Sequence, residues 1–313
     1  MTATIRPLRE SDLSAARRII SLAFGTFLGA PEPEKFWSDL DYPGTRWLAD
    51  PSSAFGAEIG GELVGSNFAT RWGSVGFFGP LTVRPDLWAR GVGKQLMEPV
   101  MGCFDTWKVE HAGLFTFAHS QKHVGLYQRF GFWPRFLTAI MSKAVQPTKR
   151  EPQWSKYSEI PESERHACLR ACAALTDALY AGLNLEREIR AAHSQRLGET
   201  VLLRDDGELV GFAVCHCGPD TEAGNHKCLI KFGAVRRGPT GGQLFDQLLD
   251  ACEALAAARR LSRLEAGVNM SRHEAYRKLL ERGFRTDIQG VAMHRANEPG
   301  YNRPEVYLID DWR

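Results

Sequence analysis

Short segments of this sequence recur about 150 residues later, in the same order. Three pairs match: Gly61-Glu62-Leu63-Val64-Gly65 with Gly207-Glu208-Leu209-Val210-Gly211, Gly93-Lys94-Gln95-Leu96 with Gly241-Gly242-Gln243-Leu244, and Gly131-Phe132 with Gly283-Phe284. The offsets are 146, 148 and 152 residues. Matches at a nearly constant offset indicate two copies of one structural unit. This duplication limits the fold more than any other feature, because both halves must adopt the same arrangement.

A boundary between the two copies is predicted near the middle of the 313-residue chain. The stretch 146–153 is polar and charged, contains two prolines and lacks apolar periodicity, which is typical of a linker. We therefore expect one domain over residues 1–146 and a second over residues 154–313. In each, short apolar strands alternate with helices of amphipathic spacing. The predicted fold is α/β, with two tandem domains that are each a twisted mixed β-sheet flanked by helices.

Composition and charge narrow the class of protein. Hydrophobic residues make up 43% and charged residues 24% of the chain, as in folded globular proteins. The formal net charge of +2 provides no strong positive electrostatic field to attract nucleic acid or an anionic membrane. No secretory leader and no run of roughly 18 apolar residues is visible. The seven cysteines are scattered, without a disulfide rhythm. We expect a cytoplasmic protein with reduced thiols and neither a nucleic-acid nor a membrane partner.

The stretch 81–96 predicts an anion-binding loop. An apolar strand ends in an Arg-Pro-Asp turn, and a basic loop containing Gly91 and Gly93 then leads into a helix. The first amides of a helix lack intrahelical partners and can bind an anion. The glycines allow close approach of the backbone, and Arg90 and Lys94 add positive charge. Alone, the pattern is equally typical of an ordinary strand–turn–helix connection.

A second motif, Leu126-Tyr127-x-x-x-Gly131-Phe132, follows the next predicted strand. Together the two motifs resemble the GNAT superfamily of acetyltransferases, over about residues 3–145 in motif and about 157–295 mainly in layout. The resemblance implies acetyl-CoA as co-substrate, with its pyrophosphate on the glycine loop and its pantetheine along the preceding strand. The cofactor-binding residues that it implies are Leu81, Thr82, Val83, Ala89, Arg90, Gly91, Val92, Gly93, Lys94 and Ser120. Trp88 stands where the family usually has Gln or Arg, and Ser120 where Asn is frequent.

The resemblance also implies a catalytic acid, Tyr127, which would protonate the leaving thiolate. A phenol suits this role because its usual pKa of about 10 keeps it protonated at neutral pH. No carboxylate lies in residues 76–81, where many relatives place Glu. The candidate general bases are His119 and Glu58. His119 is a candidate because imidazole titrates near neutral pH, and Glu58 is a carboxylate on the predicted hairpin. An amine that is partly deprotonated at working pH could alternatively need only a chain of waters.

The second half has lost the residues that these motifs need. Pro239 stands in place of the first loop glycine, and proline has no N–H to donate. Leu279 occupies the position of the acid, with Tyr276 one helical turn earlier as a weak substitute. We predict that the second copy is degenerate and either braces the first or shapes its acceptor site.

Two further clusters admit more than one interpretation. Cys215, His216 and Cys217 could suggest zinc, but alternating residues of a strand point to opposite faces and no C-x-x-C knuckle is present. We therefore expect no metal. The connection over residues 25–51 is aromatic and acidic. It could form the wall of a pocket for an amine-bearing ligand, or its aromatic residues could simply pack the loop onto the core.

The predicted function is acetyl-CoA-dependent N-acetyltransfer to the amine of a small molecule, by direct attack in a ternary complex in the first half. Direct attack is expected because no dedicated nucleophile is visible, Cys103 being the only cysteine of the first half. Two alternatives stay open: a non-catalytic acyl-CoA-binding or regulatory module, and a protein or peptide N-acetyltransferase. The sequence also leaves open whether the molecule is a monomer or a homodimer.

Overall fold

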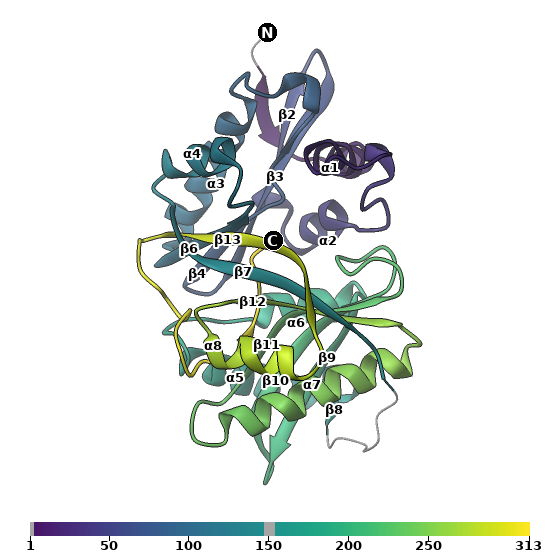
Figure 1. Ribbon diagram of the computed structural model, residues 1–313, viewed down its shortest axis with the longest axis vertical. Helices are drawn as coiled ribbons and strands as arrows, with labels where there is room; N and C mark the ends of the chain where they lie inside the picture. Colours follow the sequence, from purple (N-terminus) through teal and green to yellow (C-terminus); the bar gives the residue numbers. More distant parts are fainter. Residues whose placement is uncertain (1–2, 147–153) are drawn as a thin grey trace.

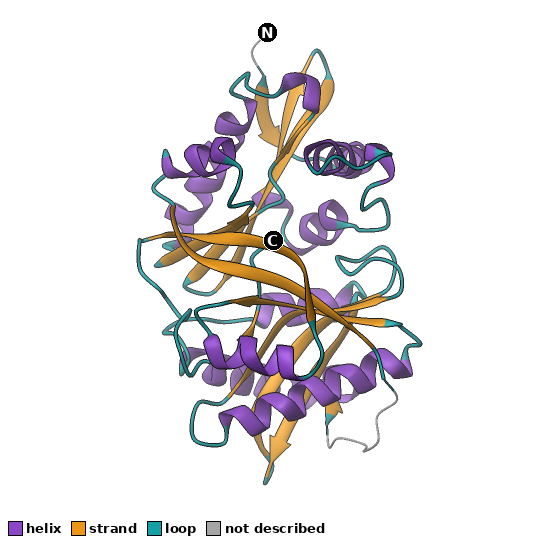
Figure 2. Cartoon of the chain, viewed as in Figure 1, coloured by secondary structure: helices purple, strands orange, loops and turns teal. Residues whose placement is uncertain are grey.

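The computed structural model describes residues 3–146 and 154–313 of the chain, so most of the predicted linker lies outside the described residues. The strands of the described parts join in one 14-stranded mixed sheet with helices on its faces (Figures 1 and 2). The path through the sheet runs β1-β2-β3-β4-β6-β13-β7-β12-β11-β10-β9-β8, with β5 paired to β3 and β14 paired to β11. Among the described helices, none is long and apolar enough to cross a membrane.

Each half contains the alternation of strands and helices that its sequence predicts. The first half comprises β1 (Thr4–Pro7), α1 (Leu13–Phe27), α2 (Tyr42–Ala49), β2 (Ala54–Ile59), β3 (Glu62–Trp72), β4 (Val75–Phe78), β5 (Thr82–Val83), α3 (Val92–Trp107), β6 (His111–Thr116), α4 (Gln121–Gln128) and β7 (Trp133–Ala144). The second half comprises β8 (Ser155–Lys156), α5 (Glu162–Asp177), α6 (Glu186–Ser194), β9 (Gly198–Asp205), β10 (Glu208–Cys217), β11 (Lys227–Val235), α7 (Gly241–Ala258), β12 (Arg263–Asn269), α8 (His273–Glu281), β13 (Arg285–Arg295) and β14 (Leu308–Ile309).

The two halves exchange their last long strands. β13 lies between β6 and β7, with Val291 opposite Thr116, and β7 in turn pairs with β12, with Thr138 opposite Asn269. The sequence predicted one sheet per domain, whereas the structure joins both into a single sheet. The physical reason is edge pairing, because each exchanged strand covers an edge whose backbone groups would otherwise lack partners.

In each half, one pair of parallel strands is paired over only a short segment. β4 and β6 are paired from Val75 to Phe77, and β11 and β12 from Lys227 to Ile230. The remaining pairs in the sheet are antiparallel. Beyond their paired segments, the strands of each parallel pair separate toward their carboxyl ends. A helix follows each separation, α3 in the first half and α7 in the second (Figure 1).

The helix after each separation is held by apolar side chains at helical spacing. In α3, the buried side chains Leu96, Met97, Val100 and Phe104 face the sheet, as expected for an amphipathic helix on a sheet. In α7 a longer series does the same and forms much of the second-half core. This packing fixes the amino terminus of each helix beside the separated strands.

Candidate cofactor and acceptor site

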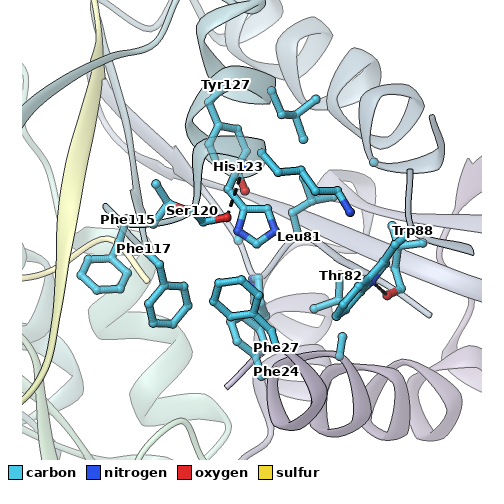
Figure 3. A pocket seen from close by; sticks show the side chains of 18 of the residues that line it. Phe24, Phe27, Leu81, Thr82, Trp88, Phe115, Phe117, Ser120, His123 and Tyr127 are labelled. Atoms are coloured by element: carbon cyan, nitrogen blue, oxygen red, sulfur yellow. Dashed lines mark hydrogen bonds between the residues drawn. The ribbon is translucent and has the colours of Figure 1, made fainter. Parts of the chain in front are cut away.

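A cavity of about 630 Å³ opens where β4 and β6 separate. Its walls come from α1, the segment around β5, the start of α3, and α4 (Figure 3). The second half also reaches it, through Ile288 of β13 and Trp312 near the end of the chain. The volume is that of a typical small-molecule site, and the cavity therefore brings both halves of the chain to one place.

The amino terminus of α3 forms one end of this cavity. Gly91 precedes the helix with a φ of 82°, in the left-handed region that favours glycine. A Cβ built there would meet nothing within 4 Å. The first helical bond runs from the Gln95 amide to the Gly91 carbonyl, 3.2 Å, so the amides of the first helical turn have no partner within the helix. This end can bind an anion through backbone groups.

Trp88 takes a structural role that its place in the motif does not predict. Its Nε1 donates to the carbonyl of Val83 at 2.7 Å. Because Arg84 donates to Val64 of β3 and strand amides alternate in direction, the carbonyl of Val83 faces away from β3, as does the backbone of Leu81. The indole N–H thus binds the Val83 carbonyl, so this carbonyl already has a partner. The outward peptide group of Leu81 is the one that can pair with an extended chain in the cavity.

Tyr127 projects from α4 into the cavity (Figure 3). Its ring packs edge-on against Phe78, 5.6 Å between centroids, and burial raises the pKa of the phenol above its usual value. Ser120 caps the same helix by accepting from the amide of His123 at 3.4 Å. A protonated phenol is therefore held beside the anion-binding end at neutral pH.

The two predicted bases lie outside the cavity. His119 is exposed and stacks on Phe27, 5.7 Å between ring centroids. Glu58 is on β2 and forms an ion pair with Arg6, 2.7 Å. The geometry instead brings His123 into the cavity wall, where burial lowers the pKa of its imidazole. The sequence did contain a signal, because residues four apart on a helix share a face and His123 precedes Tyr127 by four.

Most of the predicted cofactor residues do line the cavity. They are Leu81, Thr82, Val83, Ala89, Gly91, Val92, Gly93, Lys94 and Ser120. Arg90 is exposed and outside the wall. Lys122 and Arg129, which the sequence did not single out, join Lys94 as cations of the wall. The Lys122 ammonium also lies 5.1 Å from the centre of the Trp88 ring.

The second half also shapes the site from behind. Arg46 of α2 is buried and donates from Nε to Glu222, which follows β10, at 3.0 Å. The same guanidinium donates to the carbonyl of Gly79, two residues before Leu81. Lys231 of β11 completes the cluster, 2.8 Å from Glu222. A second-half carboxylate thereby holds the arginine that fixes the strand leading into the glycine loop.

The corresponding place in the second half is filled by the chain itself. β14 pairs antiparallel with β11, Leu308 opposite Ala234 and Ile309 opposite Gly233, just beyond the segment of β11 that pairs with β12. Tyr307 lies over the start of α7, where a Cβ on Gly242 would be 2.9 Å from the phenol oxygen. The tail thus occupies the equivalents of both the strand edge and the helix terminus.

The cysteine-rich strand β10 alternates as its pattern predicts. Cys215 packs in the second-half core, 3.9 Å from the sulfur of Cys252. His216 faces the other way, 3.9 Å from the Glu188 carboxylate. Within residues 3–146 and 154–313, no group of three His, Cys, Asp or Glu side chains is placed to hold a metal ion.

Comparison with known proteins establishes the class. A model of the acetyltransferase (GNAT) family matches residues 16–132 and 162–284, which together exceed half of the chain. The chain belongs to the GNAT family of acetyltransferases, and it carries the family unit twice. No curated protein matches the chain.

Solved structures show the same tandem fold at low identity. A protein of Pyrococcus horikoshii that is described as an acetyltransferase is 14% identical, with a TM-score of 0.71. The alignment covers 99% of this chain and 95% of that one. A GCN5-related N-acetyltransferase of Sphaerobacter thermophilus is 18% identical with a TM-score of 0.63, over 93% and 95%. A tandem GNAT protein from the clavulanic acid biosynthesis pathway is 12% identical with a TM-score of 0.56, over 94% and 98%. These similarities support a fold of two GNAT-like repeats.

Proposed function

We propose that the first half transfers the acetyl group of acetyl-CoA to the amine of a small molecule while both are bound. The observation that carries this proposal is the contrast between the two grooves. In the first half, the α3 terminus and Tyr127 open onto one cavity. In the second half, Tyr307 and β14 fill the equivalent groove.

The residues of the first half fit the parts of acetyl-CoA. The amides at the start of α3 suit its pyrophosphate, with Lys94, Lys122 and Arg129 as the cations of the wall. The outward backbone of Leu81 suits the extended pantetheine arm. When bound there, acetyl-CoA supplies the activated thioester.

The proposed reaction needs one proton donor and one proton acceptor. The amine nitrogen forms a bond to the acetyl carbonyl carbon and the carbon–sulfur bond breaks. The hydroxyl of Tyr127 gives its proton to the departing sulfur, and the proton lost by nitrogen passes to His123 directly or through water. Burial keeps Tyr127 protonated and His123 neutral at pH 7, which are the states that these two roles require.

Direct attack by the amine follows from the absence of a suitable nucleophile in the cavity wall. Among the described residues of the wall, none is a cysteine. Cys103 is half-buried on α3, and burial raises the pKa of its thiol, which lowers its thiolate fraction. A covalent acetyl-cysteine step is therefore disfavoured.

The test is binding followed by turnover. Saturating acetyl-CoA should stabilise the protein, by about 2.7 kcal/mol at a concentration 100-fold above Kd, and a panel of primary amines should release CoA thiol. Absence of both stabilisation and thiol release would overturn the proposal. Stabilisation without release to any amine or peptide would favour the non-catalytic acyl-CoA-binding alternative.

A further inference from the structure

The end of the cavity opposite the glycine loop is built from aromatic rings. Phe24 and Phe27 come from the last turns of α1, Phe115 and Phe117 from β6 and the residue after it, and Trp37 from the connection before α2. Figure 3 shows the Phe24 and Phe27 rings below the His123 side chain and the Phe115 and Phe117 rings to one side of it, with Trp88 on the opposite side. The rings contact one another rather than filling the space separately.

Ring distances define a preformed apolar subsite. The centroids of Phe27 and Phe117 are 5.1 Å apart, those of Phe24 and Trp37 are 5.0 Å apart, and those of Phe24 and Phe117 are 6.4 Å apart. These spacings are those of tilted aromatic pairs, which hold rings in fixed orientations. Ile140 of β7 and Ile288 of β13 also line the cavity, so the exchanged strands add further apolar surface.

Among the described residues of the cavity wall, none is an Asp or a Glu. Three acidic residues of the connection over residues 25–51 have partners outside the cavity. Asp41 pairs with Arg17, Asp39 accepts from the amide of Asn225 at 2.6 Å, and Glu32 pairs with Lys35. Phe27, Trp37 and Tyr42 of that connection line the cavity, and its acidic side chains do not.

We propose that the acceptor amine is carried on an aromatic ring system, as in the arylalkylamine class. This inference rests on the proposed acetyl transfer. The ring of the acceptor packs among Phe24, Phe27 and Phe117, and a short alkyl arm directs its nitrogen toward Tyr127 and His123. Such surroundings also favour the neutral amine, because burial against an apolar wall destabilises the ammonium form. A polyamine, an amino sugar or a lysine-rich peptide would place charged or hydroxyl groups against these rings, so we expect each to be a poorer acceptor.

The experiment compares kcat/KM for 2-phenylethylamine, n-butylamine, spermidine and glucosamine at saturating acetyl-CoA. Because apolar contacts discriminate by about 10-fold or more, we expect at least 10-fold preference for 2-phenylethylamine over n-butylamine and a larger preference over the other two. Spermidine or glucosamine matching 2-phenylethylamine would overturn the aromatic subsite and leave acetyl transfer intact. Failure of acetyl transfer itself would instead appear as no thiol release from any amine.

If no amine releases thiol, binding of the amine can be measured directly. A thermal shift with 2-phenylethylamine that is absent with n-butylamine supports the subsite even without turnover, and equal or absent shifts overturn it. Phe27→Leu removes one ring and should lower the ratio of kcat/KM for 2-phenylethylamine to that for n-butylamine by about 5-fold, with KM for acetyl-CoA unchanged. Leu28→Ala, at an exposed neighbour outside the wall, should leave the ratio unchanged. An unchanged ratio in Phe27→Leu would contradict the subsite.

Discussion

The two grooves of this protein start from the same scaffold and differ in what occupies them. In the first half, a Cβ on Gly91 would meet only open space. In the second half, Tyr307 lies within 3.1 Å of the Cβ position of Gly241, and β14 adds a strand to β11. The separation of parallel strands thus creates an edge that a ligand or the chain itself can complete. In the second half the chain itself completes that edge, and the fold of the duplicated unit is preserved.

The loops differ in the same sense. Gly91 has a φ of 82°, and the aligned residue of the second half is Pro239, whose ring holds φ near −65°. The left-handed glycine there is Gly238, one residue earlier, with a φ of 139°. The backbone of the second loop therefore follows another course, and its helix begins with its first turn beneath Tyr307.

Replacing Gly91 with the proline of the second half should abolish the site. Proline cannot adopt a φ of 82°, so in Gly91→Pro the loop must rearrange and the first amides of α3 lose their alignment. We expect acetyl-CoA to give no thermal stabilisation and turnover to fall by more than 1,000-fold, an effect of at least about 4 kcal/mol.

Two variants separate loss of the site from loss of the fold. Gly91→Ala places only strain of about 1–2 kcal/mol on the loop, so it should fold, with a raised KM for acetyl-CoA. Pro239→Gly makes the reverse change in the second half and should leave turnover unchanged. Full activity in Gly91→Pro would show that the cofactor does not use this loop.

Removing the hydroxyl of the proposed acid, Tyr127, should preserve cofactor binding and reduce the rate of the chemical step. Tyr127→Phe keeps the packing on Phe78 and deletes the hydroxyl, so kcat should fall by about 100-fold to 1,000-fold, as for loss of a general acid. KM for acetyl-CoA should stay the same, and the measurement is steady-state release of CoA thiol. Because burial raises the pKa of Tyr127, wild-type kcat should show no decline from loss of this proton up to pH 10.

The second half supplies the matched control for this residue. Leu279 is fully buried at the aligned position, and Tyr276 is half-buried against the second-half core. Tyr276→Phe should therefore leave kcat unchanged. If that change reduced kcat while Tyr127→Phe did not, the assignment of catalysis to the first half would be wrong.

Local patterns in the sequence predicted more than long-range pairing did. Gly91 and Tyr127 belong to motifs whose spacing is local, and both line the cavity. The exchange of β7 and β13 was not predicted, because strand alternation sets which face is buried but leaves the partner strand open. The place of the tail in the sheet could not be assigned for a related reason. Residues 306–309 have no periodicity of their own, and β14 is a strand only through its pairing with β11.

His123 is the general base that we propose from the structure, and the aligned residue of the second half is Ala275. His123→Ala copies that residue and should lower kcat by about 10-fold to 100-fold, less than loss of the acid, since water can relay the proton. Burial lowers the pKa of His123 below 6.5, so it is neutral above that pH. As the pH is lowered, the wild-type kcat should therefore decrease with a midpoint below pH 6.5. The pH profile of His123→Ala should lack this decrease.

His119 provides the comparison for that prediction. It is exposed beside Phe27 and outside the cavity wall, so His119→Ala should retain both the rate and the acid-limb midpoint. A lost midpoint in His119→Ala, with His123→Ala normal, would return the role of base to the residue predicted from sequence.

Emptying part of the second groove should affect stability and spare function. Tyr307 is half-buried over the start of α7 and packs against Phe245, 5.5 Å between ring centroids. Tyr307→Ala should lower the free energy of unfolding by about 2 kcal/mol, below the range for a fully buried aromatic residue. Turnover should be unchanged, because the side chain is remote from the first-half cavity. In Tyr307→Ala the amino terminus of α7 is uncovered, but Pro239 has no N–H to donate there. No second cofactor site should therefore form.

Calorimetric titration with CoA tests both parts of that statement. Wild type and Tyr307→Ala should each bind one equivalent per chain with the same Kd, while denaturant unfolding reports the stability loss. Two equivalents in wild type would show that β14 and Tyr307 are displaced by the cofactor. Two equivalents only in Tyr307→Ala would show that Tyr307 alone closes the second groove, and combining Tyr307→Ala with Pro239→Gly would then be expected to tighten the second site.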